Sequence, residues 1–497
     1  MRRAGRTAGA GAAPRVLHVA QPVDGGVGAY VAAVAADQAR RGWQVAVACP
    51  GEGPLPARLA EQGVPRLDWR AGRSPGLADL PAALRVRRLV RDFAPDAVHL
   101  HSAKAGLAGR AAIRGRIPTL FQPHGWSWLA ARGLVAAMAL EWERAAVRWA
   151  DVLVCVGEGE AATALRNDVR GNLAIVRNGV DLRRFRPAGG QERAAARARH
   201  GIPDGAPLAV CVGRVTRQKG QDLLLSAWEL VSEECGAARL AIVGDGDLLE
   251  ALRSRNVPGV HFAGPVADPR SWYAAADVVV LPSRWEGLPL TALEALATGR
   301  ALVAADVPGL AEVVGEKVGA AVPAGDVAAL AGALLLRLTQ PELAAAEGRA
   351  AALLSLSYDD SVALDALAEH TLRLVGASCG TGLGTSAAPT GAARTAEGAG
   401  TGVAGAPGAG VGVAAISTEG AGVPGTGVAT AGTTAVGVAG AGVTGVGVTD
   451  VGVAGMDVTG VGVAGVGVTA DAGGRSISRK TADERGFDEH CQTPCEQ

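Results

Sequence analysis

Residues 15–50 have the sequence RVLHVAQPVDGGVGAYVAAVAADQARRGWQVAVACP, and this stretch decides the class of fold. A short apolar run at 15–22 is followed by the glycine turn DGGVG, an apolar-periodic helical segment at 29–42 and a second apolar run at 44–50. Strand, glycine turn, helix and strand in this order form the repeating unit of a parallel sheet covered by helices. The pattern therefore predicts a doubly wound α/β domain.

The same alternation continues along the chain. The first block has further apolar runs at DAVHLHS, PTLFQPHG and DVLVCVG, and it closes with VRNGVDLRRFRP. A second block opens with LAVCVGR and continues with LAIVGDG, VHFAGPV, DVVVLPS and ALVAAD, with helical segments interleaved. This pattern predicts two Rossmann-like doubly wound domains, at residues 14–186 and 187–376, with a final amphipathic helix near 359–375.

Residues 377–497 differ in composition from the two α/β blocks. Gly, Ala, Val and Thr dominate, in near-repeats such as GVGVAG and GVTGVGVTD. A segment this rich in glycine and poor in aromatic residues cannot bury enough apolar surface to offset the entropy lost on ordering. We therefore expect a disordered low-complexity C-terminal tail, with a specific binding element in it as the alternative.

The charge balance excludes some classes of partner. Lys plus Arg equals Asp plus Glu at 48 each, so no global field would recruit nucleic acid. No apolar run approaches the roughly 18 residues of a membrane span, and the start MRRAGRTAGAGAAPR lacks the apolar core of a secretory signal. The sequence therefore predicts a cytoplasmic protein without a nucleic-acid partner.

Cysteine usage agrees with a reducing compartment. Cys49, Cys155 and Cys211 fall inside or at the end of apolar strand-like runs, where a free thiol behaves as a small hydrophobic side chain. Cys491 and Cys495 lie close together near the C-terminus, but no second cysteine pair or histidine cluster nearby completes a zinc site. We expect reduced core cysteines and no metal at the last pair.

Two acidic residues, one before a predicted helix and one inside it, lie in SRWEGLPLTALEALATGRALVAADVPGLAEVV, residues 283–314. Because Pro is favoured at the first helical position and Gly299 follows the last apolar turn, we expect a helix at 289–297. Glu286 then lies in the preceding loop and Glu294 in the second turn. Backbone N–H groups at a helix start favour a diphosphate, and the carboxylates could accept hydrogen bonds from hydroxyls. Two solvated acids near a helix start are the alternative.

Two basic residues follow the first strand of the second block. The sequence GRVTRQKGQDLLLSAW places Arg214 and Lys219 in the loop after LAVCVGR, and open parallel sheets bind ligands beyond the carboxyl ends of their strands. The chain has four lysines against 44 arginines, so lysine at position 219 indicates a site where a compact charge suits a phosphate. Solvated loop cations are the alternative.

Together these motifs resemble a known family. The order GR…KG, LAIVGDG, VHFAGPV and EGLPLTALEALATG is similar to that of the retaining glycosyltransferases of family four, which have the GT-B fold. DGGVG, HSAKAG, PHGWSW and VRNGVDLRRFRP add matches in the first block. The resemblance runs from Arg15 to Val375 and implies two Rossmann-like domains facing a cleft. Gly157 and Ala301 stand where the family commonly has serine and proline, away from the implied donor site.

The resemblance also implies four candidate catalytic residues. Arg214 and Lys219 would hold the diphosphate of the donor. Glu286 would bind a hydroxyl of the donor sugar. His124, in the PHGWSW motif, would lie near the transferred sugar.

Further donor-binding residues follow from the same resemblance. Glu294 would accept hydrogen bonds from the ribose hydroxyls, and the backbone N–H groups of Gly287 and Leu288 would face the sugar and phosphate. Gly26 would allow the backbone to approach the phosphate closely. The nucleobase would rest on backbone around Val266.

The implied enzyme is a hexosyltransferase-type glycosyltransferase that moves a sugar from a nucleotide-diphosphate sugar to an acceptor hydroxyl with retention, in polysaccharide, glycolipid or other glycoconjugate biosynthesis. The nucleotide sugar is a co-substrate, and neither a cofactor nor a metal ion is expected, because Arg214 and Lys219 would stabilise the leaving diphosphate. Two alternatives stay open: a nucleotide-sugar epimerase on the same fold, and a non-catalytic scaffold that acts through its tail.

Two other pairs have the residue types of a metal site. Asp245 and Asp247 follow a strand, but Asp247 is expected to be the N-cap of the next helix. His99 and His101 alternate on a strand and therefore face one side, but the sequence shows no third ligand. His101 could instead line the acceptor side. We predict no metal at either pair.

A basic amphipathic segment, LRVRRLVRDF, carries Arg85, Arg87, Arg88 and Arg91 between apolar positions. Such a helix could rest on an anionic membrane that holds a lipid-linked acceptor, which leaves open a peripheral location on the inner membrane face. The alternative is an ordinary solvated helix face over the sheet.

Overall fold

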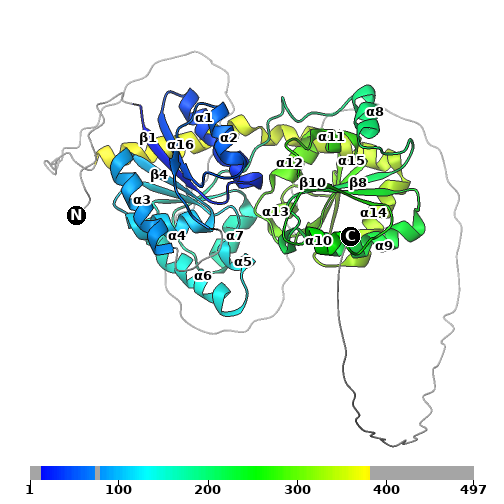
Figure 1. The fold of residues 1–497 in the computed structure, drawn as a ribbon, viewed down its shortest axis with the longest axis horizontal. Coiled ribbons are helices and arrows are strands. Elements are labelled where there is room, and N and C mark those ends of the chain that lie inside the picture. The colour runs from blue at the N-terminus through cyan, green and yellow to red at the C-terminus, as the bar shows by residue number, and fades with distance from the viewer. Residues whose placement is uncertain (1–12, 73–78, 381–497) are drawn as a thin grey trace, which may run out of the picture. The chain divides into compact units, whose positions relative to one another are not determined.

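The computed structural model describes residues 13–72 and 79–380, which form two parallel β-sheets with helices packed on both faces (Figure 1). The predicted class of fold, two Rossmann-like doubly wound domains, is thereby confirmed. Residues 381–497, with nearly all of the predicted low-complexity tail, lie outside the described residues, and so do Cys491 and Cys495.

The first sheet has seven parallel strands in the order β3-β2-β1-β4-β5-β6-β7. The strands are β1 (Arg15–Ala20), β2 (Gln44–Cys49), β3 (Arg66–Asp68), β4 (Ala97–His101), β5 (Thr119–Gln122), β6 (Val152–Cys155) and β7 (Leu173–Ile175). The central strands β1 and β4 are buried along their length except for Arg15. Burial on both faces explains why these strands have nearly continuous apolar runs.

Helices cover both faces of the first sheet. They are α1 (Gly25–Arg40), α2 (Pro54–Glu61), α3 (Asp79–Phe93), α4 (Ser102–Ile113), α5 (Ser127–Ala130), α6 (Gly133–Ala146), η1 (Val147–Trp149) and α7 (Glu158–Arg166). Residues of α1 and α2 share an apolar cluster with one face of β1 and β2. The other face packs against α3, α4 and α7, in a cluster that also contains Trp126 and Trp128.

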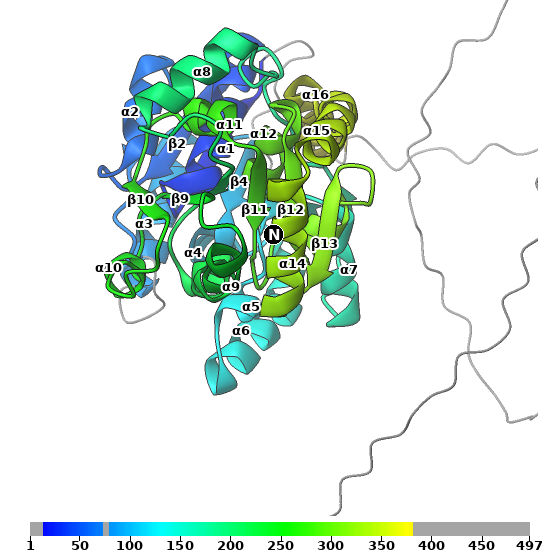
Figure 2. The same ribbon diagram turned by 90° about the vertical axis from the view of Figure 1, so that its right-hand side faces the viewer.

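The second sheet has six parallel strands in the order β10-β9-β8-β11-β12-β13, and Figure 2 shows β11, β12 and β13 next to one another. The strands are β8 (Leu208–Val212), β9 (Arg239–Val243), β10 (Val260–Gly264), β11 (Val278–Leu281), β12 (Ala301–Asp306) and β13 (Gly319–Pro323). This order places β8 and β11 side by side in the middle of the sheet.

The helices of this half again form two layers. They are α8 (Gly190–Arg199), η2 (Arg217–Lys219), α9 (Gln221–Glu234), α10 (Leu249–Arg253), α11 (Arg270–Ala275), α12 (Leu290–Ala297), α13 (Pro308–Ala311), α14 (Val327–Thr339), α15 (Pro341–Ser355) and η3 (Leu356–Tyr358). One apolar cluster joins the sheet to α8, α11, α12, α13 and α15. The opposite cluster joins it to α9, α10 and α14.

The final helix, α16 (Asp360–Gly380), returns to the first sheet. Leu367 is 1% exposed and lies in an apolar cluster with Tyr30, Val34 and Ala97. Asp365 of α16 forms an ion pair with Arg41, with 2.5 Å between the oxygen and nitrogen atoms. The helix expected near 359–375 thus contributes to the core of the first half.

One local expectation is wrong. Asp247 was expected to be the N-cap of the next helix, but α10 begins at Leu249 and its N-cap is Leu248. The backbone N–H of Leu248 donates to the carbonyl of Val215 at 3.1 Å, which holds the chain in a turn before the helix begins. Asp245 instead accepts a hydrogen bond from the backbone N–H of the next residue.

The described cysteines are all free thiols, and Cys49, Cys155 and Cys211 are buried as predicted. Within the described residues no single helix is long and apolar enough to cross a bilayer. The consecutive segments Val327–Thr339 and Pro341–Tyr358 meet the length and composition of a span only when taken together, and they are bent by 100° at their junction.

Candidate active site

Two loops that follow neighbouring strands form the candidate site. Because β8 and β11 are parallel and adjacent, the loops 213–220 and 282–289 leave the same edge of the sheet. Gly220 has a φ of 71°, and a Cβ at this position would lie 2.1 Å from the carbonyl oxygen of Pro282. Glycine is therefore required here, since only its bare Cα allows the two loops to meet.

Hydrogen bonds fix these loops to each other. The backbone N–H of Arg284 donates to the carbonyl of Gln218 at 2.8 Å, and Nε2 of Gln218 donates to the carbonyl of Trp285 at 3.1 Å. Arg284 also pairs with Asp222 at the start of α9, at 2.6 Å, and holds the pKa of that carboxyl below its usual value. The two loops therefore form one framework.

Lys219 and Glu286, both predicted site residues, meet across this framework. Nζ of Lys219 lies 2.6 Å from Oε1 of Glu286, and the side chains are only 17% and 6% exposed. Since an ammonium group has three donors, two of them remain for an anion or a hydroxyl after this contact. The ion pair fixes the position of both charged groups.

Arg214 opens the first of the two loops and lies close to the glycine turn of the first half. Within the described residues its guanidinium forms no ion pair, and its side chain is partly exposed. Its Cδ is 4.0 Å from the position that a Cβ on Gly25 would take. Leu290, at the start of α12, is 3.7 Å from the corresponding position on Gly26. An arginine beside the N-terminus of α1 offers an anion both a charge and backbone N–H groups.

Glu294 lies in the second turn of α12, as predicted. The helix begins at Leu290 rather than at Pro289, because the backbone at Pro289 is still extended, with a ψ of 133°. The hydroxyl of Tyr273 donates to Oε2 of Glu294 at 2.8 Å. Burial raises the pKa of Glu294, and the Tyr273 hydrogen bond opposes this shift. The contact at Oε2 therefore fixes the orientation of the carboxylate, and Oε1 can accept a hydrogen bond from a hydroxyl of a ligand.

Gly287 and Leu288 contact residues of the first half. A Cβ on Gly287 would lie 3.7 Å from the backbone nitrogen of Gly125, the residue after His124. The carbonyl of Leu288 accepts a hydrogen bond from Nδ2 of Asn178 at 2.6 Å. The structure therefore brings the Glu286 loop next to the loop that carries His124.

His124 follows β5 with a φ of 52°, a backbone region that non-glycine residues rarely adopt and that is often found at functional sites. Its Nε2 lies 3.2 Å from Nδ1 of His101, and its ring packs edge-on against Tyr30 with the centroids 5.0 Å apart. Burial lowers the pKa of His124 to about 3, so the ring is neutral near pH 7.

A buried carboxyl group supports the His124 loop. Oε1 of Glu160 accepts the backbone N–H of Gly125 at 2.5 Å, and Oε2 accepts that of Val156 at 2.8 Å. Burial raises the pKa of Glu160 to about 7, and these backbone hydrogen bonds oppose the shift. Glu160 thus connects the His124 loop to the end of β6.

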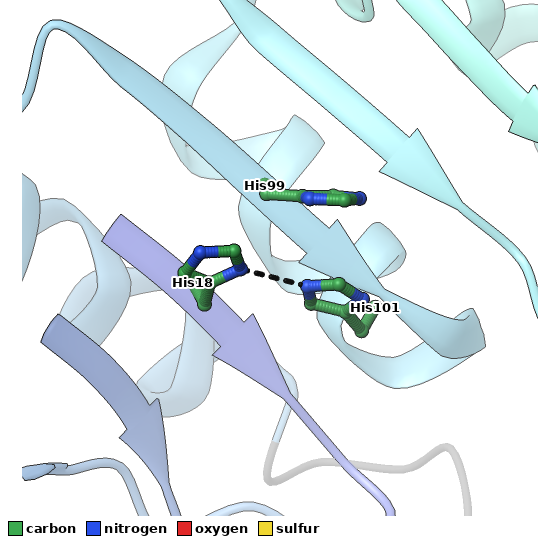
Figure 3. A group of neighbouring side chains, drawn as sticks. All are labelled: His18, His99 and His101. Atoms are coloured by element: carbon green, nitrogen blue, oxygen red, sulfur yellow. Dashed lines mark hydrogen bonds between the residues drawn. The ribbon is translucent and has the colours of Figure 1, made fainter. Parts of the chain in front are cut away.

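Three histidines gather beneath His124. His18, His99 and His101 each offer a ring atom within 4.8 Å of the others, and Figure 3 shows all three rings at adjacent strands. His18 is the register partner of His99 because β1 and β4 are neighbours. The expectation that His99 and His101 lack a third ligand is therefore wrong, since His18 supplies a third imidazole. These three residues are the group of described side chains that could hold a metal ion.

Val266 is not joined to the other predicted residues by any described contact. It lies just beyond β10 and is 39% exposed.

A pocket of about 430 Å³ lies on the same half, lined by Arg184, Asp268 and Thr298 among others, and none of the predicted donor residues lines it. Thr298 donates to the carbonyl of Glu294 at 2.8 Å, so the pocket lies one helical turn beyond this carboxylate.

Several residues that support the site were missed from the sequence. Tyr273, Asn178 and Glu160 are distant in sequence from the residues they orient. Asn178 lies within VRNGVDLRRFRP, but the match of that motif does not indicate its contact with Leu288. His18 was missed because its neighbours depend on strand order. The sequence did contain one signal, because His18 is a polar residue inside the apolar run RVLHVAQP.

Comparisons with known proteins find similar sequences for both halves of the chain. Residues 24–184 match the family model described as Glycosyltransferase Family 4, and residues 206–340 match the model described as Glycosyl transferases group 1. The D-inositol 3-phosphate glycosyltransferase of Streptomyces avermitilis is 35% identical over 283 residues, which cover 52% of this chain and 61% of that relative. The alpha-maltose-1-phosphate synthase of Mycobacterium tuberculosis is 32% identical over 318 residues, which cover 59% of this chain and 79% of that relative.

A solved structure supports the fold. Anabaena Alr3699/HepE, solved in complex with UDP-glucose, has a TM-score of 0.63 and 19% sequence identity, and the match covers 72% of this chain and 100% of that chain. At this identity the likeness concerns the arrangement of strands and helices.

Proposed function

Because the chain belongs to glycosyltransferase family 4, we propose that it transfers a sugar from a nucleoside-diphosphate donor to an acceptor hydroxyl with retention of configuration at the anomeric carbon. One observation carries the proposal: Lys219 and Glu286 pair at 2.6 Å across two loops at the same sheet edge, with Arg214 in the same loop as Lys219. A pair of cations beside an acid suits a ligand that joins a diphosphate to a polyol.

The donor diphosphate is bound by Arg214 and Lys219 in this proposal. The N-terminus of α1, which lies next to Arg214, adds backbone N–H groups, and Gly26 leaves room for a phosphate oxygen. Glu294, oriented by Tyr273, accepts hydrogen bonds from the ribose hydroxyls. Val266 is the proposed base contact, because it is exposed at the end of β10 on the same sheet.

The chemistry places developing negative charge on the leaving diphosphate. Fixed cations stabilise that charge in the transition state without reorganising during the reaction. The Lys219 side chain is held by Glu286 and is mostly buried, so its charge acts in an environment with little water screening. We propose that these side chains stabilise the leaving group without a metal ion.

The acceptor is proposed to enter on the side of His124. This is supported by the approach of Gly287 to Gly125, which brings the Glu286 loop of the second half beside His124. A neutral imidazole there can accept a hydrogen bond from a hydroxyl of the sugar or the acceptor. The named relatives differ in substrate, so the acceptor of this chain is proposed only as a hydroxyl compound, lipid-linked or free.

Peripheral contact with the inner face of a membrane is part of the proposal. Helix α3 exposes Leu80 and Leu84 by 70% and 49%, beside a row of exposed arginines. Helix α6 exposes Leu134 by 76% and Met138 by 63%. Apolar side chains next to cations favour an anionic lipid surface.

Free cysteines throughout the described part agree with a cytoplasmic location.

A panel of nucleotide sugars, screened by thermal shift on the full chain, tests the proposal. A donor at 100 times its dissociation constant should stabilise the folded protein by about 2.7 kcal/mol. The best donor is then incubated with and without a lipid or sugar extract as acceptor, in buffer containing a chelator. Anomeric analysis of the product by NMR should show retention. Conversion of the donor at the same rate without acceptor would contradict transfer and favour an epimerase.

A further inference from the structure

A chain of four hydrogen-bonded side chains leads from the interior of the first half to His124. Oε1 of Gln38, on α1, lies 2.9 Å from Nε2 of His18. Nδ1 of His18 lies 3.0 Å from Nε2 of His101, as Figure 3 shows, and Nδ1 of His101 lies 3.2 Å from Nε2 of His124. Gln38, His18 and His101 are each at most 1% exposed. Such a buried chain depends on each hydrogen bond being made.

With Oε1 of Gln38 turned toward His18, as in this structure, the first contact of this chain sets the tautomer of the three linked rings. A neutral imidazole has one N–H donor and one acceptor nitrogen, and an amide oxygen can only accept. Nε2 of His18 must therefore carry the proton that is donated to Gln38, which leaves its Nδ1 as an acceptor. By the same rule Nε2 of His101 donates to His18, and Nε2 of His124 donates to His101. The bare Nδ1 of His124 is the end of the chain.

We propose that Gln38, His18 and His101 are positioning residues, which hold His124 as the neutral Nε2–H tautomer so that Nδ1 offers a lone pair to a substrate hydroxyl. The statement that Nδ1 accepts a hydrogen bond from a substrate hydroxyl rests on the proposed function, whereas the tautomer of His124 is a property of the protein alone. The hydrogen bond to His101 also fixes the orientation of the His124 ring, as the φ of 52° at His124 requires a supporting contact.

The neutral state of the rings agrees with this arrangement. Burial lowers the pKa of His18 to about 4, and burial and the neighbouring histidines lower that of His101 well below its usual value. His99 packs against His101 with the ring centroids 3.9 Å apart, and burial keeps it neutral as well. No carboxylate is among the causes of these shifts.

A metal ion bound by His18, His99 and His101 is the competing use of the same rings. Coordination through Nδ1 of His18 and Nε2 of His101, the two nitrogens that face each other, would need a lone pair on both and so would break the 3.0 Å hydrogen bond between them. No described carboxylate is among the groups that shift the pKa values of these histidines, so a doubly charged ion in this buried group would not be neutralised by one, which is costly. The hydrogen-bonded arrangement is therefore favoured.

NMR of the full chain labelled with ¹⁵N-histidine tests the tautomer at pH 7.5. The signals of His124 are assigned by their loss in His124→Gln. We expect a protonated Nε2 and a bare Nδ1 in the substrate-free protein. A protonated Nδ1 would overturn the proposal, because it would mean that the chain runs in the opposite direction. One equivalent of zinc found by elemental analysis of the purified protein would also overturn it.

Gln38→Met removes the acceptor and keeps the size of the side chain. We expect a mixture of His124 tautomers and a kcat lower by about twofold to fivefold, since without an acceptor the two neutral tautomers approach similar populations. Val34→Ala is the matched control, because Val34 is buried one turn earlier on α1 and lies outside the hydrogen-bonded chain. It should leave the single tautomer and kcat unchanged, even where it lowers the melting temperature.

Two outcomes separate the parts of the proposal. A single unchanged tautomer in folded Gln38→Met would show that Gln38 does not orient the chain. A mixed tautomer with an unchanged kcat would show that His124 does not offer Nδ1 to a substrate. Absence of transfer by the wild type itself, with its tautomer as expected, would instead count against the proposed function of the donor loops.

Discussion

The Lys219–Glu286 pair makes stability and activity separable by mutation. Glu286 is only 6% exposed, so Lys219→Met leaves a nearly buried carboxylate without its partner. We expect this variant to lose about 3 to 5 kcal/mol of unfolding free energy, the usual cost of removing one member of a buried pair. The double variant Lys219→Met/Glu286→Gln should regain most of this loss, because neither charge remains.

Activity should not follow stability in this series. Removing a fixed cation that stabilises the leaving diphosphate should lower kcat by about 10²-fold or more. The double variant should stay as inactive as Lys219→Met, because the restored stability does not restore the positive charge. Urea unfolding followed by circular dichroism gives the first quantity, and initial rates of nucleoside diphosphate release give the second.

The Arg337–Glu347 pair provides the matched control. Its members are each 6% exposed, lie 2.6 Å apart and join α14 to α15. Arg337→Met should cost a similar unfolding free energy and leave kcat per folded molecule close to that of the wild type. If Lys219→Met behaves like Arg337→Met, with stability lost and kcat retained, Lys219 does not act on the donor and the assignment is refuted.

Three further outcomes are expected. Gly309→Ala should lower activity about tenfold or more. Its Cβ would lie 1.2 Å from the carbonyl oxygen of Gly287 and would displace the loop that carries Glu286. A normal KM for the donor together with a normal kcat would contradict this packing. Tyr273→Phe should raise the KM for the donor by about three- to tenfold, with a smaller effect on kcat, because Glu294 loses one orienting hydrogen bond. An unchanged KM would exclude Glu294 from donor binding. Acidification should destabilise the protein, because burial lowers the pKa of His18 in the folded state from 6.5 to about 4. As the pH falls below 6.5, the unfolded chain binds a proton at His18 before the folded protein does. Unfolding free energy is therefore lost between pH 6.5 and pH 4. His18 alone should contribute about 2 kcal/mol between pH 7.5 and 5, and an equally steep pH dependence of urea unfolding in His18→Asn would contradict this.

The sequence was sufficient for the fold class and for the positions of the two loops that form the candidate site. Apolar runs separated by helical segments predicted parallel sheets, and the loop positions of Arg214, Lys219 and Glu286 follow from where those strands end. Helix α8 was not identified as an element because it is mostly polar. Helices α14 and α15 were also not identified, although Asp326 caps the start of α14 and Pro341 begins α15.

Contacts between distant segments could not be predicted in the same way. The Tyr273–Glu294 hydrogen bond joins α11 to α12, and the side-chain rotamers that produce it are not encoded in either motif. The three-histidine group depends on β1 being the neighbour of β4. Asp247 has the residue type of an N-cap, but the backbone hydrogen bond from Leu248 to Val215 decides where α10 begins.

Binding of a nucleoside diphosphate to Arg214 tests the central claim most directly. Titration calorimetry with UDP and with GDP, in the presence of a chelator, is carried out on the wild type and on Arg214→Ala. We predict that one of the two nucleotides binds the wild type, and that its dissociation constant rises by about 10- to 100-fold in Arg214→Ala, the loss expected for charge-assisted hydrogen bonds. Equal affinity of the two proteins for that nucleotide would contradict the account.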